Sequence, residues 1–164
     1  MNHTITKEIW KTYGIWALWV GVAFFSVYPT CNWLTSQREN PFHIYFNGEL
    51  SIPFIPDFIW IYLSMYLLFL APPFFLNIGQ LIALGKQLIW GTLFSGLAFL
   101  LFPAQLGFTR VIPSSDFYQQ LYANLFAIDL PHNLVPSLHI VFSALIQPVI
   151  LALVAYWEEF SLVA

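Results

Sequence analysis

The residues best suited to chemistry lie in one short run of the chain, from Asp129 to His139. Within it Ser137 follows Pro136 and precedes an apolar stretch, which is the position of a helix N-cap residue. His139 then falls in the first helical turn, where free N–H groups and a partial positive charge favour phosphate or another anion. A histidine there can give a proton to a leaving oxygen. A capped helix with an interfacial histidine is the alternative, and spacing alone favours that alternative.

Arg110 is the second candidate, in the run 106–113 between two apolar stretches. A guanidinium matches phosphate oxygens in bidentate geometry, which makes Arg110 a candidate phosphate ligand. An interfacial arginine that extends its head group into water is the alternative. Arg110 and His139 are predicted on the same membrane face, at adjacent helix ends, and that convergence favours the functional interpretation.

The composition predicts a membrane protein. Of the 164 residues 59% are apolar and only 8% are charged, whereas soluble domains carry about a quarter charged residues. The mean hydropathy is +0.73 and the net charge is −3, with no basic run that would suggest nucleic acid. The length favours a single membrane-embedded domain that covers residues 1–164.

Several apolar stretches approach the twenty or so residues that a helix needs to cross about 30 Å of hydrocarbon. They run over about Ile9–Tyr28, Phe54–Leu76, Leu81–Phe102 and Ser137–Trp157. Inside lipid each backbone N–H and C=O must be paired within its segment, so these stretches should be helices. The predicted fold class is an all-α polytopic membrane bundle with about four transmembrane helices. Pro29 is expected to end the first span, and Pro72 and Pro73 to kink or end the second.

Gly91 and Ser95, four residues apart in the third span, would let a neighbouring helix approach closely. Two small residues without a special partner are an equal alternative. The distribution of lysine and arginine predicts that the N-terminus lies in the cytoplasm and both long loops lie outside, because the cytoplasmic side carries more of these cations. That side holds Lys7, Lys11 and Lys86, and the other holds Arg38 and Arg110.

The run Pro136-Ser137-Leu138-His139 resembles the second signature, Pro-Ser-x-His, of the type 2 phosphatidic acid phosphatase superfamily. Phe102-Pro103 and residues 110–113 resemble the region of its first signature, a Lys, six residues, then Arg-Pro. The stretch 129–139 is similar to a bacterial branch that includes relatives of inositol-phosphoceramide synthases. The resemblance covers about residues 53–155.

This resemblance implies a six-helix bundle that cleaves or transfers the phosphate groups of lipids without a metal or other cofactor. It makes His139 the general acid, and Ser137 and Arg110 the ligands of the phosphate. It also implies a bacterial inner membrane location, with membrane lipids and a lipid phosphate substrate as partners.

The chain departs from the family pattern in ways that matter for activity. Pro103, not Lys, stands seven residues before Arg110, and Val111 replaces the expected Pro. The third signature, Ser-Arg, five residues, His, three residues, Asp, is absent, and its His is the family's nucleophile. After His139 only 25 residues remain (164 minus 139), and none is His, Arg or Asp. The expectation is a chain that ends two helices early, an incomplete version of the bundle with weak or no activity.

One histidine cannot easily act as nucleophile and acid in the same step. His132 and His43 are further candidates on the outer face, and His3 lies on the opposite side; His132 is interpreted as a loop residue. The alternative function is a non-catalytic membrane protein that binds anionic lipid headgroups or a partner helix. A third interpretation is a fragment with no function of its own. A shortened bundle would expose helix faces that could pair with another copy or with a missing C-terminal segment.

Overall fold

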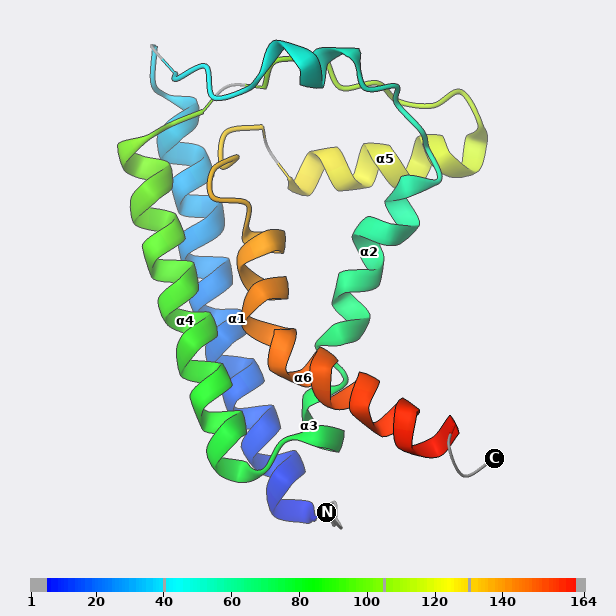
Figure 1. Cartoon of the computed structure of the whole chain (residues 1–164). Coiled ribbons are helices and arrows are strands. Elements are labelled where there is room, and N and C mark those ends of the chain that lie inside the picture. The colour runs from blue at the N-terminus through cyan, green and yellow to red at the C-terminus, as the bar shows by residue number, and fades with distance from the viewer. Residues whose placement is uncertain (1–5, 40, 105, 130, 162–164) are drawn as a thin grey trace.

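The computed structural model describes residues 6–39, 41–104, 106–129 and 131–161, and over these residues the chain is all-helical, as predicted. The helices in chain order are α1 (Lys7–Ser36), the short 3-10 helix η1 (Asn47–Ser51), α2 (Phe58–Leu68), α3 (Pro72–Phe75), α4 (Ile78–Leu101), α5 (Asp116–Ile128) and α6 (Leu138–Ser161). The long helices α1 and α4 pack against each other, and α6 packs against α4 and α2 (Figure 1). Helix α5 lies across one end of this bundle (Figure 1).

Two of the described helices, α1 with 30 residues and α4 with 24, are long and apolar enough to cross a membrane. Helix α2 has only 11 residues, whereas α6 runs over the 24 residues Leu138–Ser161. The predicted second span is broken, because α2 ends at Leu68 and Pro72 starts the separate helix α3. The four-span prediction is therefore not confirmed: among the described residues two helices meet the length and composition of a span.

The prediction that Pro29 ends the first span is wrong, because Pro29 lies inside α1. Proline removes one backbone hydrogen bond from a helix. The turns that follow are held by packing instead: Cys31 is buried, and its Sγ lies 3.5 Å from the carbonyl oxygen of Gly96 in α4. Thr35 is also buried and donates a hydrogen bond to the carbonyl of Cys31 at 2.7 Å. These contacts stabilise the helix beyond the proline.

Gly91 and Ser95 lie in α4, where a neighbouring helix does approach. A Cβ on Gly91 would lie 3.0 Å from a methyl carbon of Leu145 in α6, and Ser95 is only 2% exposed. The small-residue pair thus marks the contact between α4 and α6.

The tightest helix contact lies elsewhere, between α1 and α4. A Cβ on Gly96 would stand 2.4 Å from Cγ1 of Val27, and one on Gly85 would stand 2.6 Å from the ring of Trp16. Only glycine allows such an approach, since both distances are shorter than real Cβ contacts. These two glycines set the spacing of the two longest helices.

Two further contacts fix helix ends, one at each end of the bundle. A capping box starts α4: Asn77 Oδ1 accepts the N–H of Gln80 at 3.0 Å, and Gln80 Oε1 accepts the N–H of Asn77 at 2.9 Å. Helix α5 is tied to the start of α2, because Tyr122 donates a hydrogen bond to the carbonyl of Pro56 at 3.0 Å. Hydrogen bonds of Asp129 and Asn133 with Tyr28 place the residues that follow α5 beside α1.

Candidate functional site

Ser137 lies immediately before α6, as predicted. Its carbonyl oxygen accepts the N–H of Val141 at 3.0 Å, which is the bond that an N-cap carbonyl makes. His139 is the second residue of α6 and therefore lies in its first turn. Both side chains line the same cavity.

This cavity has a volume of about 710 Å³ and lies between α1, α2, α4 and α6. Its volume falls within the range of about 300–1,000 Å³ that small-molecule sites occupy. Most of its wall is apolar or aromatic. The polar residues of the wall gather near the start of α6, with the exception of Tyr13; they are Tyr28, Asp129, Asn133, Ser137 and His139, with Tyr62 and Tyr66 from α2.

His139 is held between two tyrosine rings of α2. The ring centre of Tyr62 lies 3.9 Å from that of the imidazole, with 32° between the planes, and the ring of Tyr66 meets it edge-on at 6.0 Å. The Nε2 atom of His139 is buried and has no hydrogen-bond partner among the described residues. A buried polar atom without a partner is costly, so this nitrogen is the position where a ligand of the cavity would gain most.

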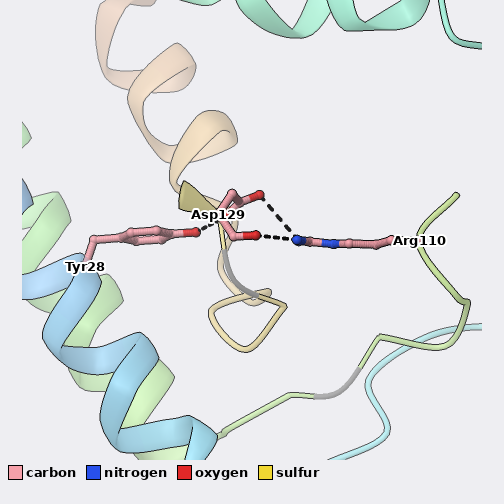
Figure 2. A network of polar contacts seen from close by, with 3 residues as sticks. All are labelled: Tyr28, Arg110 and Asp129. Atoms are coloured by element: carbon pink, nitrogen blue, oxygen red, sulfur yellow. Dashed lines mark hydrogen bonds and ion pairs between the residues drawn. The ribbon is translucent and has the colours of Figure 1, made fainter. Parts of the chain in front are cut away.

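Arg110 comes from the loop between α4 and α5 and is bound by Asp129 (Figure 2). Its guanidinium donates a hydrogen bond to the main-chain carbonyl of Asp129, and Nη2 lies 3.6 Å from Oδ2 of the carboxylate. The other carboxylate oxygen accepts a hydrogen bond from the hydroxyl of Tyr28 in α1. The guanidinium carbon also lies 4.7 Å from the ring centre of Phe126, in cation–π contact. The Arg110 and Asp129 side chains are 20% and 32% exposed, so water screens their attraction only in part.

Asp129 connects the predicted site residues to one another. It contacts Arg110 directly, and it lines the cavity together with Ser137 and His139. Arg110 itself lines a second cavity of about 550 Å³ with the loop 106–109, Pro131 and His132. Over the residues that the structure describes, no hydrogen bond joins Arg110 to His139. The two predicted groups therefore lie at the same end of the bundle and share Asp129 as a neighbour.

The other histidines are placed differently. His132 shares the second cavity with Arg110, and burial together with the nearby Arg110 charge lowers the pKa of His132 below its ordinary value. Both effects favour the neutral form of its imidazole. His43 lies in the loop before η1, with its ring 6.0 Å from that of Tyr45. His3 lies outside the described residues.

Asn133 anchors the loop between α5 and α6, a role that the sequence did not indicate. It is 6% exposed, and its side-chain amide donates a hydrogen bond to the carbonyl of Tyr28 at 2.9 Å. Its Oδ1 accepts a weak hydrogen bond from Thr35 at 3.5 Å. Tyr28 and Asn133 are 105 positions apart in the chain, so no local pattern could reveal the contact.

We expect Asn133→Ala to lower the free energy of unfolding by about 1–3 kcal/mol, because the carbonyl of Tyr28 would lose its partner in a buried place. Thermal unfolding in detergent, followed by circular dichroism, measures the effect. Asn124→Ala is the matched control, because Asn124 is exposed at the same end and pairs only with Gln120 at 3.1 Å. Equal melting temperatures for the two variants would contradict the anchoring role.

Comparisons with models of protein families, with curated proteins and with solved structures give no match for this chain. The functional assignment therefore depends on the site itself. The described chain is an all-helical protein in which a histidine with a buried Nε2 atom, an arginine–aspartate pair and an apolar cavity meet at one end.

Proposed function

We propose that this chain binds the phosphate ester of a membrane lipid at the end of the bundle where Arg110, Ser137 and His139 lie, in the manner of a phosphatidic acid phosphatase-like protein. The observation that carries the proposal is the buried, unpartnered Nε2 of His139 on the wall of a largely apolar cavity. In this proposal the chain is a multi-pass protein of the bacterial inner membrane, with α2–α3 and α6 completing the spans that α1 and α4 provide. Its N-terminus is cytoplasmic and both long loops face outward.

Each candidate residue has a distinct task in this function. The N-terminal end of α6 offers free N–H groups and a partial positive charge to the phosphate, with Ser137 as a further ligand. Arg110 binds phosphate oxygens in bidentate geometry, for which Asp129 now competes. His139 in its protonated form donates a hydrogen bond to the ester oxygen of the lipid phosphate, the oxygen that would take its proton if a nucleophile displaced it.

Hydrolysis or transfer also needs a nucleophile that accepts the phosphoryl group from the lipid. These 164 residues contain no Ser-Arg…His…Asp signature to supply it. We therefore expect the chain to bind lipid phosphate with little turnover. The alternative function is a non-catalytic protein that binds anionic lipid headgroups or a partner helix. A headgroup-binding protein would use the same Arg110 and His139, and it would differ from the first function only in having no turnover.

Arg110→Ala is expected to weaken the binding of phosphatidic acid by about tenfold, because a hydrogen bond to a charged group contributes roughly 1.5–3 kcal/mol and 1.4 kcal/mol is a factor of ten. The measurement is calorimetric titration of the full chain in detergent with short-chain phosphatidic acid. Arg38→Ala is the matched control, because Arg38 is exposed just beyond the C-terminal end of α1 and belongs to the same predicted face. Unchanged affinity in Arg110→Ala would refute the proposed function.

Turnover is tested separately, in vesicles that contain phosphatidic acid. We expect phosphate release close to the rate without protein, both for the native chain and for His139→Ala. Robust release that His139→Ala abolishes would overturn the expectation of little turnover. Loss of that activity in His132→Ala as well would identify His132 as the second histidine of the reaction.

A further inference from the structure

We propose that the apolar cavity between α1, α2, α4 and α6 binds a hydrocarbon chain of the lipid whose phosphate lies at His139. This inference rests on the proposed function and adds to it the place where the lipid's alkyl or acyl chain binds. The first support is the gradient of polarity along the wall. Tyr28, Asp129 and His139 lie at one end, and the wall continues through apolar and aromatic residues of α1, which include Val20 and Phe24.

The dimensions of the cavity match those of a lipid chain. Its wall follows α1 from Tyr28 back to Tyr13. At 1.5 Å per residue the fifteen steps from Tyr13 to Tyr28 span about 22 Å. One leaflet of a bilayer contributes about half of the 30 Å hydrocarbon core, or roughly 15 Å. A chain anchored by its headgroup near Tyr28 can therefore lie within the cavity along its full length.

The hydrogen bonds at the two ends fix the direction of the ligand. At the far end the hydroxyl of Tyr13 is already satisfied, because it donates to the carbonyl of Phe69 at 2.6 Å. At the near end Nε2 of His139 has no partner among the described residues. An apolar helix from a second copy would leave that nitrogen buried and unpaired, whereas a phosphate ester places an oxygen within its reach. The polarity of the wall therefore favours a lipid over a helix.

The wall of the cavity contains two small residues of α1, Ala17 and Gly21, and the second of them offers a direct test. A Cβ added at Gly21 meets nothing within 4 Å, so a larger side chain enters the cavity without disturbing the packing of the helices. Gly14 lies seven positions earlier in α1 and also has open space around it, but it is not part of the cavity wall. The pair Gly21→Leu and Gly14→Leu thus changes the same helix in the same way, inside and outside the cavity.

The experiment uses the full chain in vesicles that contain phosphatidic acid with a photoreactive diazirine near the end of one acyl chain. After irradiation, the labelled residues are mapped by mass spectrometry. We expect labels on the cavity wall of α1, near Gly21, and a decrease of about tenfold in Gly21→Leu, the factor that 1.4 kcal/mol gives. Gly14→Leu should label like the native chain. Ala17→Leu is the second variant, and it should reproduce the loss if Gly21→Leu fails to fold.

The outcomes separate this inference from the proposed function. Labels confined to the outer surface, or unchanged labelling in both cavity variants, overturn the inference, and the proposed function survives if Arg110→Ala still weakens phosphatidic acid binding. Equal cavity labelling by diazirine phosphatidylcholine supports the chain site and counts against the phosphate-specific function. A change of oligomeric state in Gly21→Leu, without loss of labelling, would assign the cavity to a second copy and overturn the inference.

Discussion

Asp129→Asn is expected to strengthen the binding of phosphatidic acid by about tenfold. In the structure the Asp129 carboxylate forms an ion pair with Arg110, with 3.6 Å between Oδ2 and Nη2. Asp129 also lies on the same cavity wall as His139. A phosphate that binds there must displace this anion from Arg110 and tolerate its charge. Two unit charges 4 Å apart interact by about 4 kcal/mol at an effective dielectric of 20. Partial exposure screens part of that, and about 1.4 kcal/mol, a factor of ten, remains as a reasonable expectation.

The measurement is the calorimetric titration used for Arg110→Ala. Asp57→Asn is the matched control, because Asp57 also accepts a hydrogen bond from a tyrosine, Tyr118, but is exposed and contacts neither Arg110 nor His139. Asparagine at position 129 can still accept the hydrogen bond from Tyr28, which limits the loss of stability. Weaker phosphatidic acid binding in Asp129→Asn would contradict the prediction and would mean that Asp129 orients Arg110 for the ligand.

Helices α1 and α4 and the position of His139 could be predicted because they depend on local sequence, whereas α5 lies in a stretch that was expected to be a long connection. Long apolar stretches gave α1 and α4, and the Pro-Ser pair before an apolar run gave the start of α6 within one residue. Each of these signals lies within a few turns of one helix, where spacing translates directly into position. The prediction of one continuous second span is wrong, because the apolar run ends in a turn and Pro72 begins a new helix.

The partners of the site residues could not be predicted, because they come from distant parts of the chain. Asp129 meets Tyr28 across 101 positions, and the second partner of Asp129, Arg110, lies on a loop with no periodic pattern. The cavity is built by four helices that are separated in sequence and depends on how they pack. The carboxylate next to a candidate phosphate ligand changes the chemistry of the site, and the sequence, which placed Asp129 in the polar run before α6, did not indicate its pairing with Arg110.

Gly96→Leu is expected to be the most destabilising substitution among those considered, with a loss of about 1–3 kcal/mol or more from overpacking. Even a Cβ at this position would stand 2.4 Å from Cγ1 of Val27, so α1 and α4 must separate to admit a larger side chain. Leucine is a better helix former than glycine by roughly 0.8–1 kcal/mol, so a loss of stability must come from packing. Thermal unfolding in detergent, followed by circular dichroism, measures it.

Gly14→Leu provides the control for this prediction, because Gly14 lies in α1 with nothing within 4 Å of its Cβ position. It carries the gain in helix propensity without the clash, and its melting temperature should not fall. Combining Gly96→Ala with Val27→Ala should recover much of the loss caused by Gly96→Ala alone, since the second change removes the atom that the new Cβ meets. Separation of the helices also moves Tyr28, one position beyond Val27, away from Asp129. Gly96→Leu should therefore weaken phosphatidic acid binding as well, and a stable variant with native affinity would refute the link between the helix contact and the site.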